Sequence, residues 1–342
     1  MTVLHLELGE NSYDIQIGNG LLGRCNEFFN LNRRVIVVTD SGVPAEYART
    51  VASGAKEARI VTVPMGEGSK SIEGLSTVLT AMSEFDMKRG DCAVAVGGGV
   101  VGDLTGFAAA CYMRGIDFYN VPTTLLSQVD SSIGGKTAIN FGGIKNIVGA
   151  FHQPRGVIVD TDVLVTLPER QIASGLAESV KMSLTSDKEL FEKFERMSYE
   201  GIKAEIESII TASLMIKKSV VEQDERESGL RKILNFGHTF GHGVEAEEEM
   251  HGLYHGECVA IGMLPMCSDS VRARLAPVLE KLSLPTKFSG NLESALGFML
   301  HDKKSAERGI DAVLVDEVGS CRIERMSTNA LSDRIREWVV CK

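Results

Sequence analysis

Paired cysteines, long apolar runs and excess positive charge are all missing from this sequence. The seven cysteines are scattered and form no Cys-x-x-Cys pair, so we expect reduced, mostly buried thiols in a cytosolic protein. No apolar run is long enough to cross a bilayer, and Met1 to Leu8 alternates rather than resembling a signal peptide. A net charge of −10 argues against nucleic acid as a general partner.

The overall composition is that of an ordinary globular protein. Hydrophobic residues make up 44% of the chain and charged residues 24%, with no internal repeat or low-complexity segment. A length of 342 residues suggests two domains, because single cores stop growing below this size. An anionic substrate would therefore need a local cationic pocket within an acidic protein.

The first half of the chain alternates strand and helix patterns. Apolar runs at Arg34–Asp40, Ile60–Val63 and Cys92–Val96 predict buried strands, and Ile72–Phe85 has helical periodicity. This order predicts a doubly wound, Rossmann-like α/β domain. From Pro168 to about Leu300 the pattern is almost wholly helical. We predict an α/β domain over residues 1–162 and a mainly α-helical domain over 163–342.

The stretch from Gly97 to Asn146 is the first candidate binding site. Gly97, Gly98 and Gly99 join a charge-free strand to an Ala-rich helix, an arrangement that favours an anion at the helix N-terminus. GGGxxGD is not the standard GxGxxG fingerprint, so the glycines alone leave a plain strand–helix turn open. Lys136 and Lys145 follow in the glycine-rich segments GGKT and GGIKN, which we expect to be loops that approach a ligand closely. We predict a nucleotide and a charged small substrate here.

Other polar residues follow the predicted strands at the same edge. Asp40 ends one strand, and Glu67 and Lys70 follow another. Ligands of such sheets bind beyond the carboxyl ends of the strands. Asp40 could bind the hydroxyls of a ribose or could equally cap the next helix.

A second candidate site lies in the helical half, where histidines gather. Four of the seven histidines, His238, His242, His251 and His255, fall in one short stretch. His238 and His242 are four residues apart and share one helix face. Two histidines and a glutamate suit a catalytic zinc ion, although capping or core histidines remain an alternative. HTFGH lacks the glutamate of HExxH, so we expect no peptidase.

The residues leave alternatives for the remaining metal ligands. His251 competes with His255, which we prefer because HGE precedes a small, apolar run that should be rigid. Glu178 is the candidate carboxylate. Its spacing from Lys181 also suits a pair on a helix surface, whereas its small, apolar neighbours favour burial.

Five ordered motifs together resemble the 3-dehydroquinate synthase family of sugar-phosphate cyclases. They are GGGVVGDLTGFAAACYMRG, VPTTLLSQVDSSIGGKTAIN, GLAESVK, DERESGLRKILNFGHTFGH and YHGECVAIGM. The resemblance extends from about Asp40 to Lys304. It implies an NAD-dependent lyase that uses zinc or cobalt, acts in the shikimate pathway and forms a cytoplasmic homodimer. Its reaction would convert 3-deoxy-D-arabino-heptulosonate 7-phosphate to 3-dehydroquinate and phosphate.

The resemblance also assigns site residues, all named here by their numbers in this sequence. The metal would be held by Glu178, His238 and His255. NAD would be held by Asp40, Glu67, Lys70, Gly97, Gly98, Gly99, Asp103, Thr123, Thr124, Lys145 and Thr166. Substrate would be held by Arg114, Asp130, Lys136, Asn146, Lys181, Lys217, Arg231, Asn235 and either Lys303 or Lys304. Catalytic roles would fall to Lys136, Asn146, Lys181, Glu227 and His242.

Small departures from the family pattern leave the metal set intact. Gly42 stands where an Asn near the ribose is common, and Gly243 stands where Ala is usual. Three other functions remain open: a cyclase for a sugar phosphate without a carboxylate, a metal-dependent polyol or glycerol-phosphate dehydrogenase, and a non-catalytic NAD-binding scaffold. The Lys217 and Arg231 pair favours a carboxylate substrate.

Overall fold

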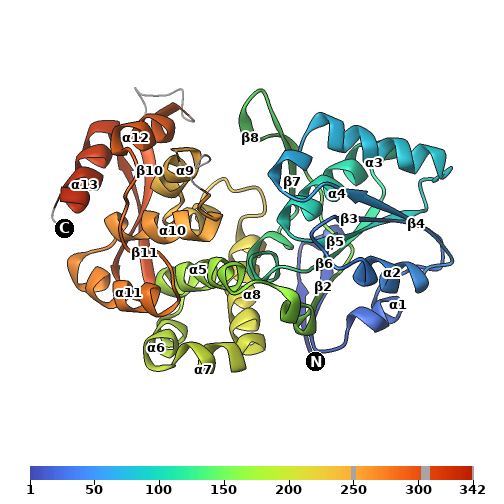
Figure 1. The fold of residues 1–342 in the computed structure, drawn as a ribbon, viewed down its shortest axis with the longest axis horizontal. Helices are drawn as coiled ribbons and strands as arrows, with labels where there is room; N and C mark the ends of the chain where they lie inside the picture. The colour runs from blue at the N-terminus through green and yellow to red at the C-terminus, as the bar shows by residue number, and fades with distance from the viewer. Residues whose placement is uncertain (248–251, 302–308, 341–342) are drawn as a thin grey trace. The chain divides into compact units, whose positions relative to one another are not determined.

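The computed structural model describes residues 1–247, 252–301 and 309–340. The chain forms two compact units, Met1–Leu167 and Pro168–Lys342 (Figure 1). The boundary predicted after residue 162, with NAD in the first domain and metal and substrate in the second, stays a prediction. No helix in the described residues is long and apolar enough to cross a membrane.

A seven-stranded sheet forms the centre of the first unit, in the order β1-β2-β9-β6-β5-β3-β4. Its strands are β1 (Thr2–Leu6), β2 (Tyr13–Gly18), β3 (Arg34–Asp40), β4 (Glu57–Val63), β5 (Cys92–Gly97), β6 (Asp117–Pro122) and β9 (Val157–Asp160). β1 pairs antiparallel with β2, and every other neighbouring pair is parallel. The carboxyl ends of the parallel strands therefore gather at one edge.

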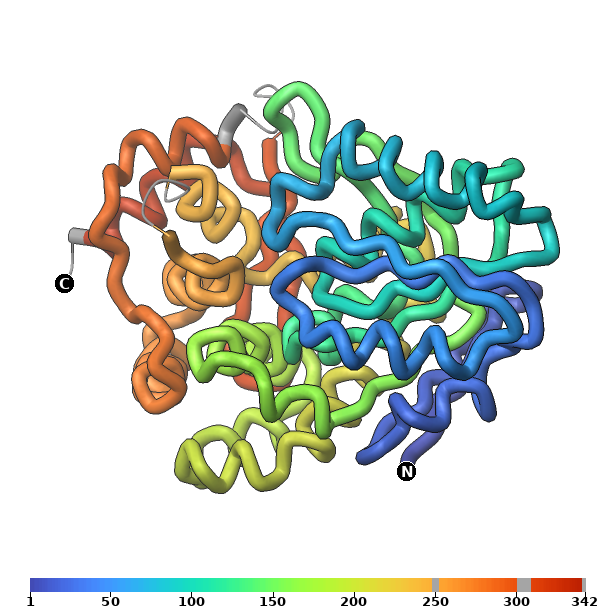
Figure 2. The backbone as a smooth tube through the Cα atoms, turned by 45° about the vertical axis from the view of Figure 1, so that its right-hand side comes forward, coloured from blue at the N-terminus to red at the C-terminus, as the bar shows by residue number. Residues whose placement is uncertain are grey.

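Helices cover both faces of this sheet, which explains the nearly continuous apolar strands. On one face, Ile36 and Val38 pack in a core with α3 (Ile72–Glu84) and α4 (Gly99–Cys111). On the other face, Val35 and Val37 pack with α1 (Cys25–Phe28) and α2 (Ala45–Ser53). Figure 2 shows α3 and α2 on opposite sides of the sheet. The predicted α/β fold class is confirmed.

A two-stranded ribbon, β7 (Lys136–Phe141) and β8 (Ile144–Phe151), stands outside the main sheet. The expectation that Lys136 and Lys145 lie in loops is wrong, because Lys136 opens β7 and Lys145 lies in β8. Gly142 and Gly143 join the strands with φ values of 60° and 78°. Two residues with positive φ form the tight turn that matches the twist of a hairpin.

The second unit is mainly helical. Its helices are α5 (Glu169–Ser186), α6 (Lys188–Arg196), α7 (Tyr199–Ala204), α8 (Ile206–Gln223), α9 (His238–Glu247), α10 (His255–Met263), α11 (Asp269–Lys281), α12 (Leu292–His301) and α13 (Thr328–Val340). A hairpin of β10 (Ile310–Glu317) and β11 (Ser320–Met326) packs among them. The long helix α5 packs against both α8 and α10, and fourteen of its residues are buried. Polar side chains on its buried face are therefore held rigidly.

Candidate active site

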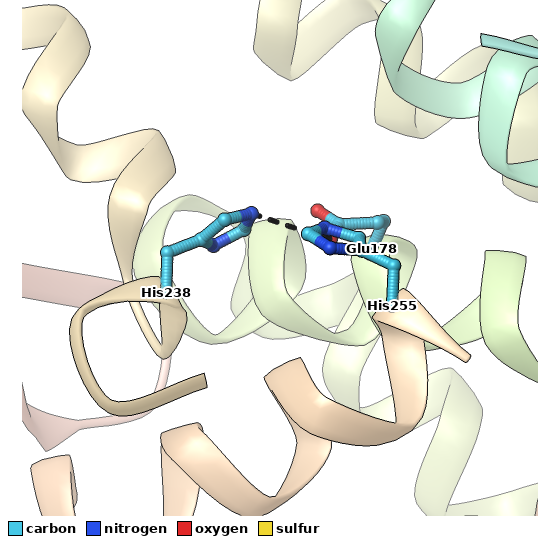
Figure 3. A group of neighbouring side chains, drawn as sticks. All are labelled: Glu178, His238 and His255. Atoms are coloured by element: carbon cyan, nitrogen blue, oxygen red, sulfur yellow. Dashed lines mark ion pairs between the residues drawn. The ribbon is translucent and has the colours of Figure 1, made fainter. Parts of the chain in front are cut away.

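Three side chains of the second unit form a cluster with the composition of a metal site. Glu178 lies on α5, His238 opens α9 and His255 opens α10 (Figure 3). One ligand atom from each lies within 4.8 Å of the other two. The Nε2 atoms of His238 and His255 lie 3.7 and 3.4 Å from Glu178 Oε1. A carboxylate and two imidazoles suit a divalent transition metal, so these residues fit the predicted ion.

The N-terminus of α10 is anchored in a way that fixes His255. The Gly256 N–H donates to Ser174 Oγ on α5 at 3.1 Å. The Glu257 carboxylate accepts the Tyr254 N–H at 2.7 Å, which caps the helix. Arg170 also donates to both oxygens of Glu257, each at 2.7 Å. Three of these four hydrogen bonds reach α5 and so hold His255 against it.

The surroundings shift the pKa values of the His238 and His255 imidazoles in opposite directions. Burial, reinforced by the Lys181 ammonium, lowers the pKa of His238 to about 3. Burial also disfavours the charged form of His255, but hydrogen bonds to Glu178 and Glu245 outweigh it and raise the pKa of His255 to about 10. His238 therefore presents a neutral nitrogen at neutral pH, whereas a cation must displace a proton from His255.

Cationic side chains are buried in the same unit. Lys181 forms an ion pair with Glu178, and both side chains are at most 1% exposed. Lys217 on α8 and Arg231, in the 3₁₀ segment Leu230–Asn235, are 5% and 2% exposed. Buried cations are costly unless they meet negative or polar partners. Their presence is typical of a site for an anionic ligand.

The segment before α9 holds Glu227, Arg231 and Asn235 in place. The Asp224 carboxylate accepts hydrogen bonds from the backbone N–H groups of Ser228, Gly229 and Arg231. Asn235 Nδ2 donates to Glu227 Oε1 at 2.7 Å. The Arg231 guanidinium donates to the Glu225 carbonyl. The structure thus brings Glu227 and Asn235 together, as a site formed by both would require.

His242 lies close to the metal cluster. Its ring centre is 5.2 Å from that of His238 and 6.0 Å from that of His255. Because His242 follows His238 by one turn of α9, both rings lie on one side of the helix. The predicted residues His251, Lys303 and Lys304 lie outside the described residues.

The second candidate site lies at the carboxyl edge of the first unit's sheet. The Thr123 N–H donates to the Gly97 carbonyl at 2.9 Å. A Cβ atom at Gly97 would lie 2.5 Å from Val101, and one at Gly98 would lie 3.1 Å from Thr124. A larger residue at either position would crowd these side chains, so glycine lets the strand turn tightly into α4. This geometry fits the phosphates of a dinucleotide.

Lys70 is the centre of a polar network beside this helix. It is 4% exposed and donates to Asp103 at 2.7 Å and to Asn146 Oδ1. Its Nζ atom also lies 3.6 Å from Glu67. The structure therefore brings together four of the residues predicted to contact cofactor or substrate.

The other predicted residues of this unit come from several of its elements. Asp40 Oδ1 accepts the Gly42 N–H at 2.7 Å, and α2 begins only at Ala45 after Pro44. The alternative that Asp40 caps that helix is therefore wrong. Thr166 lies 3.2 Å from the Tyr47 hydroxyl. Lys136 and Lys145 are exposed on the ribbon, and Asp130 lies in the π-helical turn Ser127–Ser131.

Backbone strain concentrates at predicted site residues. Among the described residues, six non-glycine positions have positive φ, and three of them are Arg114 (68°), Asn146 (56°) and Glu227 (59°). Such conformations cost energy and persist where the surroundings impose them, often at functional sites. Half of these six positions are thus residues predicted to contact substrate or to carry protons.

Sequence reasoning did not single out Asn140 or Glu245. Asn140 Nδ2 donates to Glu67 at 2.8 Å, and Glu245 Oε2 lies 3.3 Å from His255 Nδ1. Asn140 reaches Glu67 across 73 residues of sequence, whereas Glu245 reaches His255 across only ten. Only the HGVE motif, which places Glu245 seven residues after His238 on α9, hinted at the second contact.

Comparisons with known proteins place these sites in a family. The model of the 3-dehydroquinate synthase N-terminal region matches residues 60–174, and that of the C-terminal region matches residues 175–305. The chain belongs to the 3-dehydroquinate synthase family. A 3-dehydroquinate synthase from Saccharophagus degradans is 42% identical, and the match covers 94% of each chain. The family predicted from the sequence motifs is confirmed.

Solved structures outside the 3-dehydroquinate synthases share the fold. A 2-deoxy-scyllo-inosose synthase, complexed with carbaglucose-6-phosphate, NAD⁺ and Co²⁺, matches with a TM-score of 0.89 and 25% identity over 98% of this chain and 100% of that one. A 2-epi-5-epi-valiolone synthase from Streptomyces hygroscopicus subsp. jinggangensis, with NAD⁺ and Zn²⁺ bound, gives 0.86 and 25%, covering 98% of this chain and 99% of that one. Both matches cover nearly the whole of this chain and therefore include both of its units.

Proposed function

We propose that this chain converts 3-deoxy-D-arabino-heptulosonate 7-phosphate to 3-dehydroquinate and phosphate, using NAD and one divalent metal ion, Zn²⁺ or Co²⁺. The observation that carries the proposal is the cluster of Glu178, His238 and His255 in a unit that also buries Lys181, Lys217 and Arg231. A metal site suits an alcohol oxygen, and the buried cations suit a substrate with a carboxylate and a phosphate. Full-length relatives named for this activity support it.

The reaction needs a transient oxidation. When bound, NAD would take a hydride from a secondary alcohol and return it after phosphate has left, and the metal would polarise the alcohol and carbonyl oxygens. The ketone that exists in between makes the neighbouring C–H acidic enough for phosphate to leave by β-elimination. Ring opening and intramolecular aldol closure complete the product without net redox change. The protein must therefore hold two anionic groups and manage protons at several oxygens and carbons.

In the first unit, the proposed NAD-binding residues are those at the carboxyl edge of the sheet. Gly97 to Gly99 and the start of α4 would hold the pyrophosphate, with Thr123 and Thr124 beside them. Asp40 would accept the hydroxyls of a ribose. Further contacts would come from Glu67, Lys70, Asp103, Lys145 and Thr166. Arg114, Asp130, Lys136 and Asn146 would contact substrate.

In the second unit, the proposed residues would bind the anionic groups of the substrate and transfer protons. Arg231, which is buried and held by Asp224 and Glu225, would pair with the carboxylate together with Lys217. Lys181 would donate to a substrate oxygen near the metal ligands. Glu227, oriented by Asn235, and His242, beside His238, are the proposed proton carriers.

Phosphate release from the proposed substrate tests this function. With catalytic amounts of NAD and added Zn²⁺, phosphate should appear without accumulation of reduced cofactor, which is followed by its absorbance. Accumulating reduced cofactor without phosphate would indicate a dehydrogenase. Phosphate released only from a sugar 7-phosphate without a carboxylate would indicate a related cyclase. If neither signal appeared while NAD still bound, the chain would be a non-catalytic NAD-binding scaffold.

We also propose that the protein works in the cytoplasm as a homodimer, as the family resemblance implies. Sedimentation equilibrium of the purified chain tests the second point. A mass near twice the 37.0 kDa of one chain is expected, and a monomer at working concentrations would contradict it.

A further inference from the structure

The two nitrogens of His255 face two different carboxylates. Nε2 lies 3.4 Å from Glu178 Oε1, inside the metal cluster, and Nδ1 lies 3.3 Å from Glu245 Oε2. A neutral imidazole has one N–H and one lone pair, on opposite nitrogens. Since the lone pair on Nε2 is the one aimed at the cluster, the N–H belongs on Nδ1, facing Glu245.

His238 shows the same arrangement with a different acceptor. Its Nδ1 lies 3.2 Å from the Phe236 carbonyl oxygen, while its Nε2 faces Glu178 at 3.7 Å. Each histidine therefore presents Nε2 to the cluster and has an acceptor behind Nδ1. Histidines that bind metals usually donate their second ring N–H in this way, which fixes the tautomer and the ring orientation.

The fold brings Glu245 to His255 from a neighbouring helix. His238 and Glu245 are seven residues apart on α9, and therefore lie on one face of it. Helices α9 and α10 pack together, and a Cβ atom at Gly241 would lie 3.0 Å from the Cys258 carbonyl. This close packing lets the short carboxylate of Glu245, 21% exposed, reach the imidazole of α10.

We propose that Glu245 is a positioning residue that holds the Nδ1–H of His255 and thereby aims Nε2 at the metal. The inference rests on the proposed function for the metal itself. Removing such an acceptor typically weakens metal binding about 10- to 100-fold. It should leave NAD binding unchanged, because the residues proposed for NAD lie in the other unit.

The contact could instead mark a second metal site. One ligand atom each of His242, Glu245 and His255 also lie within 4.8 Å of one another. A metal held there through Nδ1 of His255, with another held through Nε2, would require an imidazole that has lost both protons. Glu245 as a hydrogen-bond acceptor needs no such step, and the two possibilities differ in the number of ions bound.

Three variants of the full chain test the role of Glu245. Glu245→Ala removes the acceptor, whereas Glu245→Gln keeps an oxygen that can accept from Nδ1. Glu247→Gln is the matched control, because Glu247 lies two residues along α9 and accepts from the Asn291 N–H at 3.1 Å instead. Co²⁺ affinity and stoichiometry are measured from the visible absorption of the bound ion, and NAD affinity by calorimetry.

We expect the parent chain to bind one Co²⁺. Glu245→Ala should bind Co²⁺ about 10- to 100-fold more weakly and with an altered absorption spectrum. Glu245→Gln should lose less affinity. The Glu247→Gln control should match the parent. Co²⁺ affinity in Glu245→Ala equal to that of the control would overturn the proposal, and so would two ions per parent chain with one lost in the variant. If Glu245→Ala does not fold, Glu245→Gln provides the test. A Co²⁺ affinity and spectrum of Glu245→Gln equal to those of Glu247→Gln would then overturn the proposal. Metal binding without phosphate release in the parent would contradict the proposed function alone.

Discussion

Asn140 connects to Glu67 across 73 residues of sequence, donating its side-chain amide at 2.8 Å. Its Oδ1 accepts the Asn146 N–H at 2.9 Å, and its own N–H donates to the Lys70 carbonyl at 2.8 Å. One residue of β7 thus ties together three residues predicted to contact NAD or substrate. Its side chain orients Glu67. Its backbone N–H attaches strand β7 to the segment that contains Lys70.

Asn140→Asp should therefore weaken NAD binding about tenfold, because a donor to a carboxylate becomes a second carboxylate facing it. The bond accepted from Asn146 can survive, so the change isolates the contact with Glu67. Calorimetric titration with NAD measures the affinity. Asn26→Asp, an exposed site in the same unit, is the control. Equal NAD affinities in the two variants would contradict the prediction.

Gly243→Ala restores the residue usual in the family and should nevertheless destabilise this chain. A Cβ atom at Gly243 would lie 2.4 Å from the Ala295 carbonyl oxygen on α12, and backbone atoms cannot move aside cheaply. Overpacking of this kind costs about 1–3 kcal/mol in the free energy of unfolding. Urea unfolding provides the measurement.

Gly297→Ala on α12 is the matched control for that variant. A Cβ atom there meets nothing within 4 Å, so the same substitution should stabilise the helix by about 0.4–1 kcal/mol. Opposite signs for the two variants are expected. A stabilised Gly243→Ala would show that α9 and α12 do not pack as closely as the structure places them.

The sequence predicted the parts of this fold whose signal is local. The charge-free run Cys92–Val96 gave a central strand because both of its faces are covered by helices. The β7–β8 ribbon was missed because Lys136 and Lys145 suggested binding loops. Alternating residues around Gly142 and Gly143 were the available signal, since two adjacent glycines favour a tight hairpin.

Among the predicted site residues, the sequence brought out Glu178, His238 and His255 as one group, but it did not bring out the contacts that hold other predicted site residues in place. Glu178, His238 and His255 have the chemistry of ligands and lie in family motifs, and the structure places their ligand atoms together. The contacts of Asn140 with Glu67 and of Asp224 with Arg231 depend on how distant or irregular segments fold onto each other. No periodicity or composition encodes such pairs, so they required the three-dimensional structure.

The pKa of Asp224 gives a prediction for acid stability. The hydrogen bond from the Arg231 N–H, joined by those from Gly229 and Ser228, lowers the pKa of Asp224 well below its usual value. A carboxyl whose pKa is lowered on folding stabilises the protein above its unfolded pKa of about 3.9, and this contribution is lost as the pH falls towards the folded value. Asp224→Asn should thus lower the free energy of unfolding at neutral pH.

The difference between Asp224→Asn and the parent should shrink as the pH is lowered below about 4, because the unfolded parent then takes up a proton that the folded carboxylate does not. Urea unfolding at neutral and acidic pH checks this. Asp333→Asn changes an exposed carboxylate that pairs only loosely with Arg336, at 3.4 Å, and should have little effect at either pH. A constant difference across the pH range would mean that shape, not charge, is what Asp224 supplies.

His238→Ala should remove metal binding and turnover while leaving the fold in place. The pKa of His238, lowered to about 3, keeps its imidazole neutral and ready to bind a cation. Its side chain is 13% exposed, so truncation leaves a small, partly open space rather than an unpaired core charge. Zinc content by elemental analysis, circular dichroism and phosphate release are measured on the same sample. His5→Ala, on an exposed edge strand, is the control. Retained zinc together with retained turnover in His238→Ala would show that the ligands lie elsewhere, whereas lost zinc with an intact spectrum would tie the ion to this cluster.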